Sequence, residues 1–136
     1  MRPRLFTITV TPRFGDVDAF RHVNNACLPA WFELGRMPLY VLFRPDMDFD
    51  LWNLVLAHLS VDFHTPMALG YDVEIRTYVS RVGTSSFTSY QEAWQRGKLC
   101  ASGEAVVVHH DAIEKRSLPI PSELRTALLE HVKPEA

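Results

Sequence analysis

A helix without a polar face is the strongest constraint on how this chain folds. Residues 30–43 read AWFELGRMPLYVLF, which is apolar on nearly every side of a helix, with Glu33 and Arg36 as the charged exceptions. A helix of this kind is stable in water only when other parts of the protein cover it. Pro38 lies inside the segment, where it removes an N–H donor and clashes with the preceding turn, so we expect a kink or a local break there.

The rest of the chain supplies β-strands that can cover this helix. Alternating apolar residues predict a strand from Leu5 to about Arg13, ahead of the helix. After a loop at 44–53, richness in β-forming residues predicts further strands at 54–63, 73–79, 86–94 and 99–109. Tight turns at 81–84 and 96–98 would join the later strands as an antiparallel meander. Ser122 is expected to N-cap a short helix from Glu123 to about His131.

One apolar helix against one face of a curved sheet is a two-layer α+β domain. With 136 residues, the chain fits a single domain over 1–136 that can bury a sizeable core. The other edge and face of the sheet need cover. We therefore expect a homodimer, which could pair into a homotetramer.

Composition excludes several classes of protein. The chain is 47% hydrophobic and 22% charged, as is typical of a globular domain, and its net charge of −2 argues against a nucleic-acid partner. No apolar run is long enough to span a bilayer, so we expect no membrane association. The N-terminal segment lacks the apolar core of a secretory signal, and Cys27 and Cys100 form no CxxC pair. A cytoplasmic protein with reduced thiols is expected.

The segment 14–26 reads FGDVDAFRHVNNA and gathers titratable and hydrogen-bonding side chains just before the helix. Backbone amides at a helix start point outward unpaired, and with the helix dipole they stabilise negative charge developing on a nearby oxygen. Asp18 would then lie beside an oxyanion site, which suits attack on a carbonyl carbon or delivery of water to it. Aspartate and asparagine are also favoured in turns and at helix starts. On spacing alone that second interpretation comes first for any single residue, and Asp16 in particular reads as a turn or capping aspartate.

The longer segment FGDVDAFRHVNNACLPAWFELGR resembles the signature of the hotdog-fold thioesterases, in the group similar to 4-hydroxybenzoyl-CoA thioesterase. The usual form is roughly F-x-D-x-D-x-x-G-H-V-N-N-A-x-Y, followed by a helix with an aromatic pair, Glu and Arg. The matching positions are Phe14, Asp16, Asp18, His22, Val23, Asn24, Asn25, Ala26, Trp31, Phe32, Glu33 and Arg36. Weaker matches continue in the correct order as far as Pro119 and Pro121, so the resemblance covers essentially the whole chain.

This resemblance implies a hotdog fold, a long antiparallel sheet wrapped around a central helix, dimerised so that active sites lie at the subunit boundary. It implies hydrolysis of an acyl thioester, most often acyl-CoA and otherwise an acyl-carrier thioester, with no metal and no cofactor. The catalytic carboxylate would be Asp18, as nucleophile or as general base. His22 either takes part in the chemistry or anchors the loop, Asn25 neighbours the site, and Asn24 has a structural role.

Other residues are candidates for holding the substrate. The phosphates of CoA suit Arg or Lys near strand edges, such as Arg81, Lys115 and Arg116. Ser85 and Ser86 could contact the thioester or pantetheine, although all five positions also fit solvated turns. Phe20 could line the acyl pocket. Arg21, where the family commonly has Gly, could reach a phosphate or an acidic acyl tail. Either the backbone there needs no positive φ, or the loop differs slightly.

Two other functions remain open from the sequence. The first is a non-catalytic protein that binds or senses acyl-CoA in the same groove. The second is a hotdog hydratase or dehydratase, a class that typically pairs His with Asp or Glu in a motif not found in this sequence. Cys27, at the helix start, could pair with His22 as a nucleophile, but it reads more simply as a small buried side chain. The histidines, including His58, His64, His109 and His110, show no metal-binding spacing.

Overall fold

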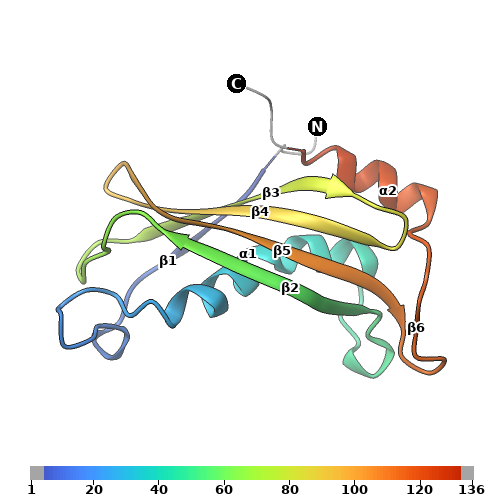
Figure 1. The fold of residues 1–136 in the computed structure, drawn as a ribbon, viewed down its shortest axis with the longest axis horizontal. Helices are drawn as coiled ribbons and strands as arrows, with labels where there is room; N and C mark the ends of the chain where they lie inside the picture. The colour runs from blue at the N-terminus through green and yellow to red at the C-terminus, as the bar shows by residue number, and fades with distance from the viewer. Residues whose placement is uncertain (1–4, 133–136) are drawn as a thin grey trace.

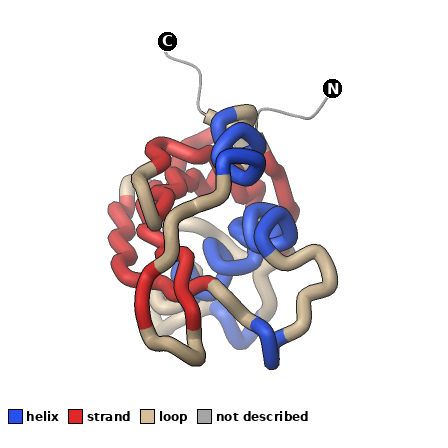
Figure 2. The backbone as a smooth tube through the Cα atoms, turned by 90° about the vertical axis from the view of Figure 1, so that its right-hand side faces the viewer, coloured by secondary structure: helices blue, strands red, loops and turns tan. Residues whose placement is uncertain are grey.

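A long helix lies along the concave face of a curved antiparallel sheet in the computed structural model, which describes residues 5–132 (Figure 1). Seen from the side, the strands curve around this helix (Figure 2). The elements in chain order are β1 (Phe6–Val10), the 3₁₀ helix η1 (Phe14–Asp16), α1 (Cys27–Phe43), the 3₁₀ helix η2 (Phe49–Leu51), β2 (Leu54–Phe63), β3 (Val73–Val82), β4 (Ser86–Gln95), β5 (Lys98–Asp111), β6 (Arg116–Ser117) and α2 (Ser122–Leu129). The predicted two-layer α+β architecture is confirmed.

The sheet is not the simple meander that the order of the strands suggested. Within residues 5–132 its order is β1-β3-β4-β5-β2, with β6 paired to β5. Only β3, β4 and β5 follow one another as hairpins, whereas β2 pairs with β5, in a register that sets Leu54 opposite His109 and Phe63 opposite Ala101. The segment 64–72 is long enough to carry the chain across the sheet from β2 to β3. The prediction that consecutive strands pair was therefore wrong for this connection.

Helix α1 packs closely on the sheet through one small residue. A Cβ at Gly35 would lie 2.7 Å from Cγ2 of Ile75 and 2.8 Å from Nε2 of Gln91, so only glycine permits this approach. Next to it, the Arg36 side chain is 1% exposed; its Nε donates to the Tyr40 hydroxyl at 2.8 Å and its Nη1 to Oε1 of Gln91 at 3.1 Å. These bonds satisfy a buried cation and fix the helix against β4.

Pro38 does not break the helix, which starts at Cys27, earlier than predicted, and continues without interruption to Phe43. The proline leaves the carbonyl of Leu34 without its helical donor, but Leu34 is 53% exposed, so water can take that place. Leu34 and Val41, seven residues apart on one side of the helix, are both exposed. A single chain therefore covers α1 only in part.

The ends of several elements also differ from the prediction. Strand β1 ends at Val10, ahead of Pro12, and β6 appears in a segment expected to be a turn. Helix α2 begins at Ser122 with Pro121 as its N-cap, so the predicted capping by Ser122 was wrong; the Ser122 carbonyl instead accepts a hydrogen bond from the Thr126 hydroxyl at 3.0 Å.

The two ends of the elongated molecule carry different loops (Figure 1). The loop that precedes α1 and the turn between β4 and β5 lie at one end. The turn between β3 and β4, η2 and β6 lie at the other end. This arrangement decides which of the predicted site residues can meet within one chain.

Candidate active site

Asp18 immediately precedes a three-residue hairpin loop formed by residues 19–21. Val17 and Val23 form an antiparallel bridge, the Asp18 amide donates to the His22 carbonyl at 3.0 Å, and the Arg21 amide donates to the Asp18 carbonyl at 3.0 Å. Arg21 has φ of +65°, in the left-handed region that such a loop requires at its last position and where glycine is favoured. The first alternative, that this position needs no positive φ, was therefore wrong: arginine adopts a backbone conformation that is strained for it.

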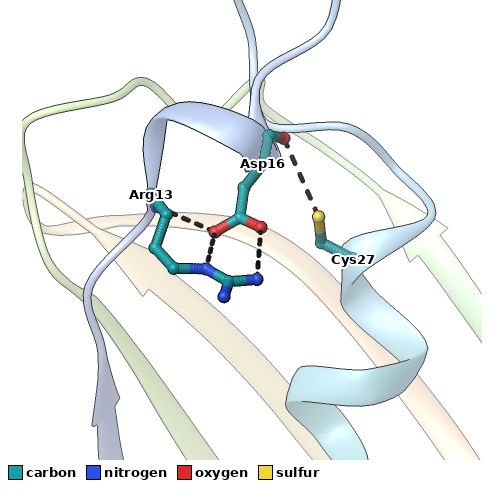
Figure 3. Close-up of polar contacts among 3 residues, drawn as sticks. All are labelled: Arg13, Asp16 and Cys27. Atoms are coloured by element: carbon teal, nitrogen blue, oxygen red, sulfur yellow. Dashed lines mark hydrogen bonds and ion pairs between the residues drawn. The ribbon is translucent and has the colours of Figure 1, made fainter.

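Asp16 and Arg13 form a hydrogen-bonded pair that occupies both carboxylate oxygens of Asp16 (Figure 3). Its Oδ2 accepts the Arg13 amide at 2.8 Å and Nε at 3.4 Å, and its Oδ1 accepts Nη2 at 3.2 Å. The hydrogen bonds from the Arg13 side chain, and then from its amide, hold the pKa of this carboxyl below its ordinary value. The Asp16 carbonyl accepts the Asn24 amide at 2.7 Å. The prediction of a capping aspartate is confirmed.

Asp18 is half-buried, and its carboxylate is only partly used by the fold. Its Oδ1 accepts the Phe20 amide at 2.9 Å, while no hydrogen bond within residues 5–132 reaches its other oxygen. The side chain faces a cleft of about 330 Å³. The lining residues are Asp18, Phe20, His22, Val23, Asn25, Phe63, His64, Thr65, Pro66 and Met67.

The cleft brings together Asp18, His22 and Asn25, the three residues that the resemblance placed in or beside the active site. His22 and Asn25 are exposed and line the cleft with Asp18. The His22 backbone helps to close the loop, but in the described part of the chain no residue forms a hydrogen bond with its ring. Anchoring of the loop by the imidazole therefore has no support. Asn24 has the predicted structural role, because its Oδ1 accepts the Ala26 amide at 3.0 Å.

The sequence did not identify His64 as a residue of this cleft. Its ring Nε2 lies 2.8 Å from the Ser102 hydroxyl, and its backbone amide donates to the Cys100 carbonyl at 2.8 Å. These bonds hold the end of β2 and the following loop against β5. The position follows a strand and precedes a Thr–Pro turn, and neither feature distinguishes a cleft residue from a solvated one.

The start of α1 is less open than predicted. The Ala26, Cys27 and Leu28 amides donate to Oδ1 of Asn24, the Asn24 carbonyl and the Asn25 carbonyl, respectively. Among the described residues, none accepts a hydrogen bond from the Asn25 amide. The row of unpaired amides is thus shorter than predicted, and the Asn25 amide belongs to a residue that lines the Asp18 cleft.

Cys27 is poorly suited to act as a nucleophile. Its thiol donates to the Asp16 carbonyl at 3.7 Å (Figure 3). Burial, and then the nearby Asp16 charge, raise the pKa of the Cys27 thiol, which keeps it protonated. A protonated thiol is a weak nucleophile, in agreement with the interpretation of Cys27 as a structural residue.

A family model described as the thioesterase-like superfamily matches residues 12–128, nearly all of the described chain. The chain belongs to the thioesterase-like superfamily. This membership confirms the predicted family and supports thioester hydrolysis as its general chemistry. No curated protein matches the sequence.

Solved structures agree with this assignment. A predicted thioesterase from Bacillus stearothermophilus is 39% identical, with 97% of this chain and 99% of that chain covered and a TM-score of 0.93. A thioesterase from Thermus thermophilus, solved with coenzyme A and Zn, is 28% identical over 90% of this chain and 96% of that chain, with a TM-score of 0.81. A 4-hydroxybenzoyl-CoA thioesterase is 13% identical over 93% of this chain and 99% of that chain, with a TM-score of 0.78, and shows the shared fold. The predicted hotdog fold is confirmed.

This member of the superfamily does not bring its predicted substrate-binding residues together within one chain. Phe20 lines the Asp18 cleft, and Arg21 lies in the Asp18 loop but not in the cleft wall. The other predicted residues lie at the opposite end of the sheet: Arg81, Ser85, Ser86, Lys115 and Arg116. Strand β2 separates the two ends, and its ten residues span roughly 30 Å at about 3.3 Å per residue.

The described residues provide no group of three or more His, Cys, Asp or Glu side chains placed to hold a metal ion. His109 is buried and its Nδ1 lies 3.1 Å from the Pro119 carbonyl, which accounts for it structurally. None of the helices between residues 5 and 132 has both the length and the apolar character needed to cross a bilayer.

Proposed function

We propose that this protein hydrolyses acyl-CoA or acyl-carrier thioesters, with Asp18 as the essential carboxylate. One observation carries the proposal: within residues 5–132 one carboxylate oxygen of Asp18 accepts no hydrogen bond, and Asp18 lines a cleft together with His22 and Asn25. A carboxylate whose hydrogen-bonding capacity is already filled can only support the fold. One with a free oxygen beside a cavity can act on a bound ligand.

Two routes lead from this geometry to the same products. The free oxygen of Asp18 attacks the thioester carbonyl carbon, the thiolate leaves, and water hydrolyses the acyl–aspartyl anhydride. Alternatively, Asp18 takes a proton from a water molecule that attacks the same carbon. Either route yields a carboxylic acid and a thiol. The unpaired Asn25 amide is the group available to stabilise the negative charge that develops on the carbonyl oxygen.

We also propose that the site is completed by a second copy of the chain. Within residues 5–132 the outer edge of β2 has no partner strand, and Val55, Leu56 and Phe63 are exposed along this strand. Leu34 and Val41 on α1 are exposed as well. An unpaired, apolar ten-residue edge favours pairing with another strand.

Two-fold antiparallel pairing along β2 would have a direct consequence for the site. The Leu54 end of one copy would face the Phe63 end of the other. The cavity of about 270 Å³ beside Leu54, which is lined mostly by apolar side chains together with Glu33, would then stand next to the Asp18 cleft of the other copy, where it could receive the acyl group. It is lined by Glu33, Met37, Tyr40, Phe49, Trp52, Leu54, Leu56 and Val107. The same pairing would bring the predicted Lys115 and Arg116 of one copy toward the cleft of the other.

Release of free thiol tests the proposed reaction. The wild-type protein should release thiol from at least one acyl-CoA in a panel of short, long and aromatic acyl groups, and Asp18→Asn should lower that turnover at least a hundredfold. Binding of acyl-CoA without thiol release would indicate a sensing protein. Conversion of an enoyl thioester to its hydroxyacyl form, again without thiol release, would indicate a hydratase.

A charged residue on the free edge tests the dimer. Leu56→Lys should shift the protein from dimer to monomer in light scattering coupled to size-exclusion chromatography, with a parallel loss of turnover. Because Leu56 is exposed, the monomer should remain folded by circular dichroism. A wild-type protein that is monomeric and fully active would contradict this part of the proposal.

A further inference from the structure

A second cleft adjoins the Asp18 cleft and shares two of its walls. Thr65 and Pro66 line both cavities, and the second cavity has a volume of about 250 Å³. Its lining residues are Thr65, Pro66, Ala68, Gln95, Arg96, Lys98 and Cys100. The charged side chains among them are both cations, and no carboxylate lines the wall. This cleft is therefore electropositive in a protein whose net charge is −2.

No residue between 5 and 132 neutralises the charges of Arg96 and Lys98. In the described part of the chain neither forms an ion pair, whereas Arg13, Arg44 and Arg76 pair with Asp16, Asp46 and Glu74. Arg96 and Lys98 are also exposed, so a ligand can reach both. Two free cations at one cleft attract an anion, and a neutral or cationic ligand would gain nothing from them.

The walls of the second cleft are held in place by specific contacts. The Arg96 guanidinium lies over the Tyr71 ring at 4.2 Å from its centroid, a cation–π contact that limits its motion. The Gln95 side chain accepts the Ala68 amide at 2.9 Å and donates to the Ala68 and Tyr71 carbonyls at 2.8 and 3.0 Å. The loop between β2 and β3 is thus tied to the turn between β4 and β5.

Arg96 occupies a position that favours a different residue. Arg96 and Gly97 have φ of +55° and +76° in the two-residue turn between Gln95 and Lys98. Positive φ at both residues defines a type I′ turn, whose first position favours Asn, Asp or Gly. Arginine is unfavourable at this first position and adds backbone strain. Such strain is expected where a side chain serves a function rather than the fold.

We propose that this second cleft binds the phosphate at the far end of the pantetheine arm of the substrate, while the thioester lies in the Asp18 cleft. The guanidinium of Arg96 donates to the phosphate oxygens in a fork, and the Lys98 ammonium adds a point charge. This inference rests on the proposed function, because it names the thiol half of the same substrate. Both CoA and the prosthetic group of an acyl-carrier protein have a phosphate at this position. Both clefts belong to one chain, so the phosphate site does not require a second copy.

Binding of a graded series of thiol carriers tests the assignment. Titration calorimetry would compare pantetheine, 4′-phosphopantetheine and CoA on the wild type, on Arg96→Gln/Lys98→Gln and on Arg76→Gln. Arg76 is the matched control, since its guanidinium also lies over an aromatic ring, that of Trp94 at 4.5 Å, but pairs with Glu74 away from both clefts. Glutamine at position 96 keeps a side chain at the positive φ of this position and removes the guanidinium with its charge.

The wild type should bind 4′-phosphopantetheine about tenfold or more tightly than pantetheine, and the double variant should lose that gain. Arg76→Gln should keep it. Loss of the gain for both phosphorylated ligands assigns the cleft to the phosphate shared by CoA and carrier proteins. Loss for CoA alone would move the assignment to the nucleotide phosphates and overturn the pantetheine-phosphate site.

Unchanged affinity for both phosphorylated ligands in the double variant would also overturn the inference, as would equal binding of all three ligands by the wild type. The proposed function has an independent readout. Thiol release that depends on Asp18, measured with an acyl-pantetheine that carries no phosphate, would stand even if Arg96 and Lys98 proved irrelevant. Conversely, phosphate-dependent binding to Asp18→Asn would stand without any turnover.

Discussion

Asp16 and Asp18 lie two residues apart in one loop, yet the fold uses them in opposite ways. Asp16 is 7% exposed, and both of its carboxylate oxygens accept hydrogen bonds from Arg13. Asp18 is half-buried and lines a cleft; one of its oxygens accepts the Phe20 amide, and no hydrogen bond within residues 5–132 reaches the other. The donors around a carboxylate, rather than its place in a motif, therefore decide whether it supports the fold or is free to act on a ligand.

Besides Asp18 itself, His22 is the residue of the cleft whose replacement should have the largest effect on turnover. The His22→Ala variant should lower turnover by about tenfold to a hundredfold, because the ring lines the cleft and has no structural partner in residues 5–132. Its free energy of unfolding should change by less than about 0.5 kcal/mol, because the side chain is exposed. Thiol release and urea unfolding would measure the two effects. A large loss of stability would return His22 to the role of loop anchor.

The Asp16→Asn variant tests how much the contact between Arg13 and Asp16 stabilises the fold. The amide keeps the shape of the side chain but places a donor among the Arg13 donors, so we expect a loss of about 1–2 kcal/mol in the free energy of unfolding. The Arg13 guanidinium is largely exposed, and its ion pair contributes little of this. Urea unfolding at pH 7 measures the loss. Stability equal to that of the wild type would show that the Arg13–Asp16 unit is dispensable.

Low pH should remove from the wild-type protein the stabilisation that the contact between Arg13 and Asp16 provides. Because Arg13 lowers the pKa of Asp16 in the folded state, the unfolded chain takes up this proton at a higher pH than the folded one. The stabilisation is therefore complete above the ordinary aspartate pKa and is lost as the pH falls below about 4, through the folded-state value. Unfolding at pH 7, 5, 4 and 3 should show the difference between wild type and Asp16→Asn shrinking at the acid end. A difference that is constant with pH would contradict this account.

The smallest effect is expected at the turn that presents Asp18. Arg21→Gly removes a side chain from a left-handed backbone position, and we expect it to stabilise the protein by up to about 1 kcal/mol. Thermal unfolding measures the change, and Gly70, already at φ +98°, marks a position where the reverse change Gly70→Ala should destabilise. Destabilisation by Arg21→Gly would mean that the arginine side chain makes contacts worth more than the strain.

The sequence predicts the parts of this fold that depend on local pattern. The apolar segment at 30–43 indicated the central helix, and the predicted strand at 54–63 coincides with β2. The pairing of β2 with β5 could not be predicted in the same way, because it depends on where the segment 64–72 carries the chain. Local propensity also could not reveal that Pro38 falls four residues after an exposed residue, Leu34, where water can take the place of the missing donor.

For the candidate site, the motif located the loop but not its hydrogen bonds. The resemblance selected Asp18, His22 and Asn25, which line one cleft, and the capping role of Asp16 followed from residue type. His64, Arg96 and Lys98 lie near that cleft only because strands distant in sequence end at the same edge of the molecule. The unpaired amides at the start of α1 were overestimated because Asn24 accepts the Ala26 and Cys27 amides and the Asn25 carbonyl accepts the Leu28 amide.

The most direct test of the central claim is a single-turnover measurement of acyl-CoA cleavage on the matched pair Asp16→Asn and Asp18→Asn. With enzyme in excess, the observed rate reports the chemical step rather than product release. After correction for the folded fraction, Asp18→Asn should be slower than wild type by at least a hundredfold, while Asp16→Asn should stay within about tenfold. Equal losses in the two variants, or full activity in Asp18→Asn, would contradict the assignment of Asp18 as the essential carboxylate.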